Sequence, residues 1–104
     1  MMLVTSDTIA NKTVVQTLGL VRGNTIRTRN IGRDILAGLK NLVGGEIEEY
    51  TKLMAEAREQ ALDRMEAEAK ALGANAVIDV RFSTSEIMSA ASEILAYGTA
   101  VIIE

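Results

Sequence analysis

Four arginines lie close together in the first third of the chain, and their side chains are the clearest candidates for binding chemistry. Arg22, Arg27, Arg29 and Arg33 fall within twelve residues, with no acidic residue between them. A guanidinium group binds a phosphate or a carboxylate through two parallel hydrogen bonds. Arg27, Arg29 and Arg33 are therefore a candidate anion-binding group. The alternative is that these arginines form salt bridges with the acidic helix of a neighbouring subunit.

Acidic residues recur along residues 49–66 at spacings of three, four and seven, which would place them on one side of a helix. They are Glu49, Glu56, Glu59, Asp63 and Glu66. Because the chain has no Cys and no His, a bound metal ion would need oxygen ligands or methionine sulfur, and oxygen-only sites favour Mg²⁺, Ca²⁺ or Mn²⁺. Such a row of carboxylates is more often a solvated helix face.

Catalytic chemistry has little support in the residue types present. Without Cys and His, the chain cannot form disulfides, thiolate nucleophiles or a triad that contains His. Asp79, Arg81, Tyr97 and Thr99 fall close together in a predicted hairpin and could form a polar cluster in a cleft, but none of them is a nucleophile with an adjacent base. We therefore expect a protein that is not an enzyme, with this cluster as the catalytic alternative.

The chain has 104 residues, and we expect a single domain over residues 1–104. The net charge of −3 argues against general nucleic-acid binding. Residues 1–45 carry a balance of +4 and residues 46–104 a balance of −7, so we expect basic and acidic surfaces to meet within the fold or between subunits. No apolar stretch reaches the roughly 18 residues of a membrane span, and the N-terminus lacks the features of a signal peptide. We expect no membrane partner and a cytoplasmic location.

The longest regular pattern covers residues 46–72, where apolar residues recur every three or four positions without Pro or Gly. This pattern predicts a long amphipathic helix, which Gly73 would end. A shorter pattern of the same kind predicts a helix over residues 33–43. The pair Gly44-Gly45 would end that helix and separate it from the longer one.

Two strands are predicted before the helices. Residues 2–5 are apolar and predict a brief edge strand. Residues 12–22 are rich in Val, Thr and Leu and predict a longer strand, with Gly19 at a bulge or a close backbone approach. Residues 24–32 are polar and basic, and they indicate extended chain or loop.

Two further strands are predicted after the long helix. Residues 75–83 alternate between apolar and polar side chains, which is typical of a half-buried strand. The apolar face would comprise Ile78, Val80 and Phe82, and the polar face Asp79 and Arg81. Residues 84–91 predict a turn. Residues 92–103 predict a final strand with apolar residues on both faces, which indicates that one face lies in an interface.

Strands at both ends of the chain with helices between them predict an α+β fold, in which an antiparallel sheet packs against one long helix. That helix would be roughly 40 Å long, whereas a compact chain of this size has a radius of gyration of about 13 Å. The helix must therefore bend or cross a sheet built from more than one subunit. Together with the two-faced final strand, its length predicts a homo-oligomer.

Four stretches of the chain form a specific pattern of motifs. They are GLVRGNTI (19–26), RNIGRDILAGLKNLVGGE (29–46), ALGANAVIDVRF (71–82) and AYGTAV (96–101). In this order and spacing, together with Tyr50 and Arg58, they resemble the YbjQ-like family of small bacterial and archaeal proteins. The resemblance covers most of the chain. It implies a dodecin-like α+β subunit that assembles as a ring, a homo-pentamer in which strands of adjacent subunits combine.

The resemblance implies no catalytic residues. The matched positions that it marks as structural are Asn30, Asp34, Gly44, Gly45, Gly73, Gly98 and Thr99. The expected function is a non-catalytic, homo-oligomeric binding or scaffold protein whose main partner is itself. Families of this kind also carry a heavy-metal-binding label, which implies the alternative of a ring that binds a metal ion or a small anion.

Overall fold

The computed structural model describes residues 1–28, 45–88 and 91–104 of the chain. The elements in these ranges are β1 (Met2–Leu3), β2 (Val14–Thr28), α2 (Gly45–Ala71), β3 (Ala76–Met88) and β4 (Ala91–Ile103). The short N-terminal strand, the long helix and the last two strands confirm the predicted elements. The helix expected over residues 33–43 lies outside the described residues.

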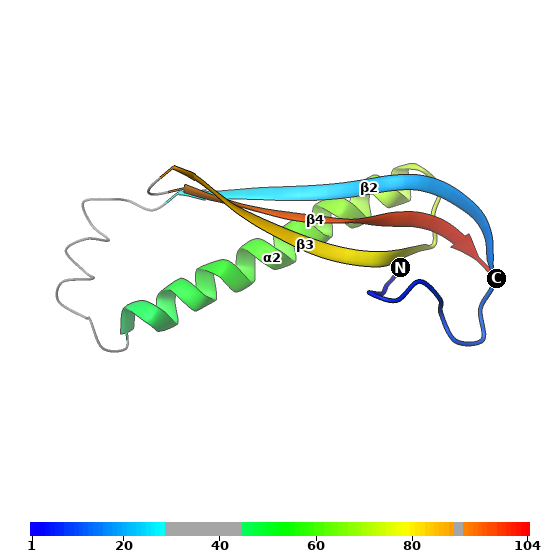
Figure 1. Cartoon of the computed structure of the whole chain (residues 1–104), viewed down its shortest axis with the longest axis horizontal. Helices are drawn as coiled ribbons and strands as arrows, with labels where there is room; N and C mark the ends of the chain where they lie inside the picture. Colours follow the sequence, from blue (N-terminus) through cyan, green and yellow to red (C-terminus); the bar gives the residue numbers. More distant parts are fainter. Residues whose placement is uncertain (29–44, 89–90) are drawn as a thin grey trace.

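The strands form one sheet in the order β1-β3-β4-β2, and α2 crosses one face of it (Figure 1). The strand β4 runs antiparallel to both of its neighbours, β2 and β3. The strand β1 pairs with β3 in parallel, with Met2 opposite Ala76 and Leu3 opposite Val77. The α+β class is confirmed. The sheet is mixed rather than antiparallel, because the N-terminal strand joins the outer edge of β3 in the same direction.

The apolar stripe of α2 holds the helix against the sheet. Ala57, Ala61, Met65 and Ala69 are fully buried, and their spacing of four residues places them on one side of the helix. The strand residues in the same core cluster are Val21, Val77, Val80, Ile94, Ala96 and Ala100. Because three of the four helix residues are alanines, the helix can lie close to the strands.

The structure is elongated along the helix and the strands (Figure 1). The helix has 27 residues and is therefore roughly 40 Å long. The radius of gyration is 17.3 Å, compared with about 13 Å for a compact chain of this length. After the helix, Gly73 adopts a φ of +89°, which favours glycine and lets the chain turn back into β3.

The strand β4 carries apolar residues on both sides, as predicted. Ile94, Ala96 and Ala100 belong to the core beneath α2. Leu95 and Tyr97 alternate with them on the opposite side of the sheet and are half-buried. We call that opposite side the open face, because α2 packs against the other side of the sheet (Figure 1). At one end of the open face, Ala76 and its partner Val101 are nevertheless fully buried.

Register shifts in β2 and β3 decide which residues reach the open face. β2 has one shift between Val14 and Gln16 and a second between Thr17 and Gly19, where Gly19 has a φ of +121°; of the two predicted alternatives, the bulge is the one confirmed. β3 has one shift between Ile78 and Arg81, where Asp79 has a φ of +55°, and a second between Glu86 and Met88. A slip of one residue turns every following side chain to the other face of a sheet.

The bulge at Asp79 overturns the predicted alternation of residues 75–83. Val80 is buried in the core, whereas Ile78 and Arg81 both lie on the open face, as their partners in β4 show. Phe82 lies on the helix side but remains 45% exposed. The three apolar residues therefore do not share one face, because the extra residue in the strand reverses the order of the sides.

The strands also extend further than predicted. The strand β2 continues to Thr28, into the segment where extended chain or loop was expected. The strand β3 continues to Met88 and β4 begins at Ala91, so the predicted turn over residues 84–91 is mostly strand. Pairing across the hairpin explains the difference, since Thr84 lies opposite Ile94 although its own stretch is small and polar.

Candidate functional site

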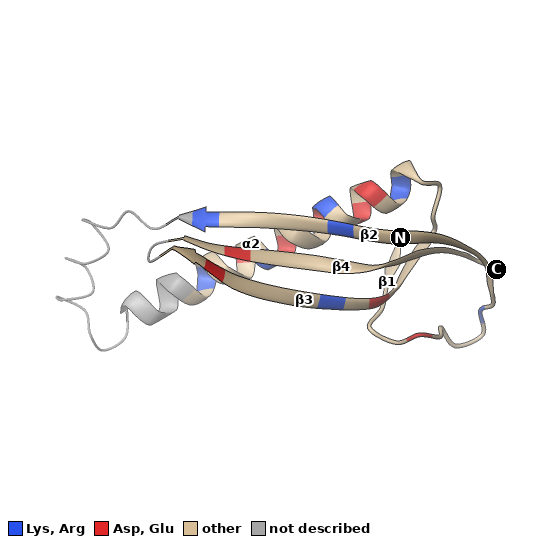
Figure 2. Ribbon diagram, turned by 45° about the horizontal axis from the view of Figure 1, so that its top comes forward, with Lys and Arg blue, Asp and Glu red and all other residues tan. Residues whose placement is uncertain are grey.

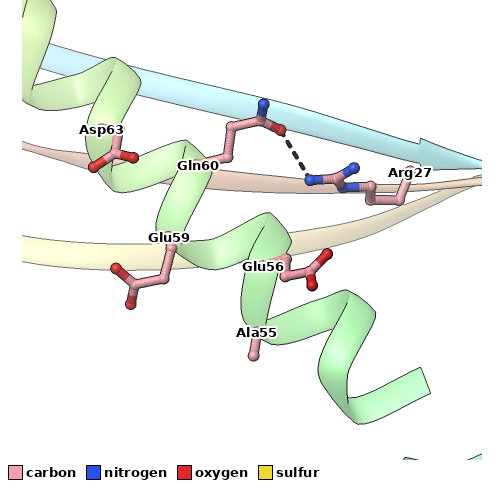
Figure 3. A pocket seen from close by; sticks show the side chains of 6 residues that line it. All are labelled: Arg27, Ala55, Glu56, Glu59, Gln60 and Asp63. Atoms are coloured by element: carbon pink, nitrogen blue, oxygen red, sulfur yellow. Dashed lines mark hydrogen bonds between the residues drawn. The ribbon is translucent and has the colours of Figure 1, made fainter. Parts of the chain in front are cut away.

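The predicted anion-binding group is represented in the structure by Arg27, near the end of β2. The side chain of Arg27 turns towards α2, where Nη2 donates a hydrogen bond to Gln60 Oε1 at 3.0 Å (Figure 3). Arg29 and Arg33 lie outside the described residues. Of the three predicted residues, only Arg27 is therefore described by the structure, and its side chain contacts α2.

An open recess of about 430 Å³ lies beside the guanidinium group of Arg27. Its lining consists of Arg27, Ala55, Glu56, Glu59, Gln60 and Asp63. Three carboxylates and one guanidinium give the recess an excess of negative charge, which repels a small anion. These surroundings favour a structural role for Arg27 against α2 over the capture of an anion.

The acidic side chains of α2 that the structure describes, which do not include Glu49, do not assemble a metal site. The carboxylates of Glu59 and Asp63 extend away from Arg27, while Glu56 lies nearer to it (Figure 3). Glu66 contacts Lys70 Nζ at 3.6 Å. Within residues 1–28, 45–88 and 91–104, no group of three or more Asp, Glu, His or Cys is arranged to hold a metal ion.

Two buried polar atoms near the recess lack a hydrogen-bond partner within the part of the chain that the structure describes. They are Thr25 Oγ1 and Arg27 Nε. Thr25 is only 2% exposed and precedes Arg27 by two residues, so both lie on the helix side of β2. Since buried polar groups are normally bonded, each atom has the capacity for one more hydrogen bond, from water or from another part of the chain.

Two of the glycines that the resemblance marks as structural have clear backbone roles. Gly45 is the first residue of α2. Gly98 lies in β4 beside β3, where an added Cβ would meet Val77 Cγ1 at 2.7 Å and Ile78 O at 2.9 Å, so a side chain does not fit there. The predicted structural residues Asn30, Asp34 and Gly44 lie outside the described residues.

The open face carries a polar row that the sequence predicted only in part, because Arg22 was not expected beside the predicted polar cluster. Arg22 of β2 and Arg81 of β3 both lie opposite Tyr97 of β4, and Figure 2 shows two basic positions level with each other on either side of β4. Thr99 lies on the same face, two residues after Tyr97 in β4. Of the polar cluster considered for catalysis, three members thus share the open face, and Asp79 lies in the adjoining bulge. The bulge at Gly19 was the one signal of this arrangement in the sequence.

The contact between α2 and the edge strand β2 was also missed. Arg64 Nη1 donates a hydrogen bond to Asn24 O at 2.6 Å. Gly23 makes room for the helix, because a Cβ there would overlap Ala61 O and Met65 N. No local pattern around Gly23 reveals that a helix lies against it.

The exposed side of α2 is strongly charged. Glu56, Arg58, Glu59 and Asp63 are all exposed. Neither α2 nor any other helix in the described ranges is long and apolar enough to span a membrane.

Comparisons with known proteins identify relatives of this chain over its whole length. The family model described as "Putative heavy-metal-binding" matches residues 1–104. A UPF0145 protein of Dehalococcoides mccartyi is 61% identical over 104 residues, which is 100% of both chains. A UPF0145 protein of Halorubrum lacusprofundi is 65% identical over 96 residues, 92% of each chain. One of Archaeoglobus fulgidus is 59% identical over 97 residues, 93% of this chain and 90% of the relative.

A solved structure shares the fold. It is the crystal structure of a protein of unknown function from Pediococcus pentosaceus that belongs to the DUF74 family. It matches with a TM-score of 0.67 at 16% sequence identity, over 100% of this chain and 98% of that chain, so the likeness concerns the fold alone. The family model and the relatives match over the full length and confirm the resemblance seen in the motifs: the chain belongs to the YbjQ-like family, whose members among these relatives are named UPF0145 proteins.

Proposed function

We propose that this protein is a subunit of a homo-oligomeric ring that binds or scaffolds other molecules without catalysing a reaction. The open face of the sheet is the observation that carries the proposal. On it, Leu20 is 62% exposed and Ile26 is 54% exposed, and Leu95 is half-buried. Monomeric proteins rarely expose large apolar patches, so further copies of the chain are the proposed cover.

The elongated shape supports assembly. A chain of about 100 residues buries only about two thirds of its unfolded surface even when it is compact. With a radius of gyration of 17.3 Å, this chain is more extended than a compact domain and exposes more surface. Contacts between copies would bury the additional apolar surface and stabilise the fold.

The strand β2 offers a second surface for association. It forms one edge of the sheet over 15 residues, and an edge strand presents N–H and C=O groups that can pair with another chain. Within the described ranges, Arg64 donates a hydrogen bond to the carbonyl oxygen of Asn24, which is one of the acceptors on this strand. We propose that strands of adjacent copies combine here into the closed, dodecin-like pentamer that the family resemblance implies.

The residue types support binding without catalysis. The chain has no Cys and no His, which are the side chains most suited to nucleophilic attack and to proton transfer near neutral pH. The polar side chains nearest to Tyr97 on the open face are those of Arg22, Arg81 and Thr99. Side chains of these types can donate hydrogen bonds to a ligand.

Native mass spectrometry of the purified protein tests the assembly. We expect a mass about five times that of the 11.2 kDa chain. Leu20→Lys places a charge on the open face and should shift the protein to lower masses, whereas Leu72→Lys is the matched control, because Leu72 is 48% exposed at the end of α2. A wild-type protein that is folded and monomeric at micromolar concentration would refute the proposal.

A ring that binds a metal ion is the second candidate, favoured by the description of the matching family. Since the chain has no Cys or His, its ligands would be oxygen atoms or methionine sulfur. Elemental analysis of the assembled protein, after incubation with divalent metals and dialysis, separates the two candidates. One metal ion per copy or per ring supports the metal-binding role, and an assembled ring that retains no metal supports the scaffold.

A further inference from the structure

Arg22 and Arg81 each follow closely after a register shift that decides which face they reach. Without the shift between Thr17 and Gly19, the nearer of the two in β2, Arg22 would lie opposite Ala96, on the helix side of the sheet. Without the shift in β3, Arg81 would lie opposite Ala96 as well. With both shifts, the two arginines flank Tyr97 on the same face. The row of Arg22, Tyr97 and Arg81 therefore depends on one bulge in β2 and one in β3.

Both shifts occur where the backbone has a positive φ, which is +121° at Gly19 and +55° at Asp79. Positive φ is uncommon for residues other than glycine, and such positions are concentrated at functional sites. Bulges also occur next to binding and active sites, where they redirect a side chain. In this sheet the redirected side chains are guanidinium groups.

The geometry of the row suits a ligand held above the ring of Tyr97. Adjacent strands are about 4.8 Å apart. Because Arg22 and Arg81 are both opposite Tyr97, their Cα atoms lie about 10 Å apart across β4. Arg81 is anchored at one nitrogen, because its Nη1 donates to Thr5 O at 2.7 Å and to Val80 O at 2.9 Å. Its Nε and Nη2 groups are left for a ligand.

No salt bridge neutralises this row within the described ranges. The ion pairs found there join Glu66 to Lys70 and to the N-terminal amino group. Glu93, which shares the open face further along β4, accepts a hydrogen bond from Asn24 Nδ2 at 3.2 Å. The row therefore presents two positive charges and one phenolic hydroxyl.

We propose that Arg22, Tyr97 and Arg81 bind a phosphate group, either as free phosphate or as a phosphate ester. Guanidinium groups bind phosphate oxygens in pairs, and the hydroxyl of Tyr97 supplies a further donor. The site is complete within one copy of the chain and does not depend on the proposed ring. For added phosphate to reach the row, contacts between copies in the proposed ring must cover apolar residues such as Leu20 and leave Arg22, Tyr97 and Arg81 open to solvent.

Isothermal titration calorimetry of the full chain tests this site, in low-salt buffer with inorganic phosphate and glycerol phosphate as the two probes. The wild type should bind saturably. Arg22→Gln and Arg81→Gln should each lose at least about tenfold in affinity, because each removes charge-assisted hydrogen bonds. Tyr97→Phe should lose about threefold, since it removes one neutral donor. Tighter binding of glycerol phosphate would identify an ester as the source of the group, and tighter binding of inorganic phosphate the free ion.

Arg58→Gln is the matched control, because Arg58 is an exposed arginine of α2, on the other side of the sheet, and its variant should bind like the wild type. Native mass spectrometry of each variant reports folding and assembly independently of phosphate. If Arg81→Gln unfolds because it loses its bonds to Thr5 and Val80, Arg22→Gln decides alone. Equal affinity in the wild type and Arg22→Gln, or no saturable binding of either probe by the wild type, would overturn the proposal.

Discussion

Gly23 is the position at which α2 rests directly on the sheet, and Gly23→Ala tests how firmly the helix is held there. A Cβ at residue 23 would overlap Ala61 O and Met65 N and would lie 2.8 Å from Arg64 C. All three are backbone atoms of the helix, so no side-chain rotation relieves the overlap. The whole helix must move away from β2 to admit a single methyl group.

The cost of that movement follows from the packing of the helix stripe. Overpacking of a buried contact costs about 1–3 kcal/mol, and rigid backbone atoms favour the upper end of the range. A gap of about 0.5–1 Å also removes a quarter to a half of the dispersion attraction across the contacts of Ala57, Ala61 and Ala69, which are fully buried. Alanine also gives the unfolded chain less conformational freedom than glycine, which stabilises the folded variant by about 0.4–1 kcal/mol. The expected net loss is about 2–3 kcal/mol.

Thermal unfolding followed by circular dichroism measures this loss. For a chain of this size, about 1 kcal/mol lowers the Tm by roughly 4–8 °C, so Gly23→Ala should unfold about 10–20 °C below the wild type. All variants must be compared at one protein concentration, because assembly makes the Tm depend on concentration.

Gly73→Ala is the control for the general effect of replacing glycine. Gly73 has a φ of +89°, but an added Cβ there would have no neighbour within 4 Å. Its replacement should cost about 1 kcal/mol from backbone strain alone. If Gly23→Ala were no less stable than Gly73→Ala, the helix would not depend on contact with Gly23, and the inferred helix–strand packing would be wrong.

Four further substitutions, at three positions, test the core, the helix–strand hydrogen bond and the bulge at Asp79. Met65→Ala removes a fully buried side chain of the core and should lower the free energy of unfolding by about 2–5 kcal/mol in urea denaturation; a loss below about 1 kcal/mol would contradict its burial. Arg64→Gln removes the donor to Asn24 O and should cost about 1 kcal/mol by the same assay, so no change would show that this bond contributes nothing. Asp79→Val places a β-branched residue at a φ of +55° and should lower the free energy of unfolding by about 1–3 kcal/mol. Asp79→Gly should remain within about 1 kcal/mol of the wild type. Equal stability of the two variants would refute the strained bulge.

Local patterns in the sequence predicted the elements whose signals lie within one stretch of chain. The four-residue spacing of Ala57, Ala61 and Met65 has one regular structure that buries all three, and the helix was confirmed. Apolar residues on both sides of the last strand likewise predicted β4, which was confirmed; the interface expected on its second face stays a prediction. By contrast, residues 84–88 are small and polar and resemble a turn, but pairing with β4 makes them strand.

The candidate site was less predictable than the elements. The charge of Arg27 was visible in the sequence, but its surroundings come from α2, where Gln60 accepts its hydrogen bond and acidic residues line the recess. Of the four arginines that are close in the sequence, the two that the structure describes, Arg22 and Arg27, lie on opposite faces of the sheet. Arg22 belonged to the predicted cluster, yet the structure pairs it across the sheet with Tyr97 and, beyond it, Arg81.

The sequence by itself determined the helix, the two-faced final strand, the bulge at Gly19 and the membership of the YbjQ-like family, because each rests on residue types and spacings within a continuous segment. Tertiary structure decided the parallel pairing of β1, the bulge at Asp79 and the faces to which the side chains of β2 and β3 turn. The physical reason is that the register of a sheet depends on pairing between distant segments, and one inserted residue reverses the side of every residue after it. The row formed by Arg22, Tyr97 and Arg81 exists only through that pairing.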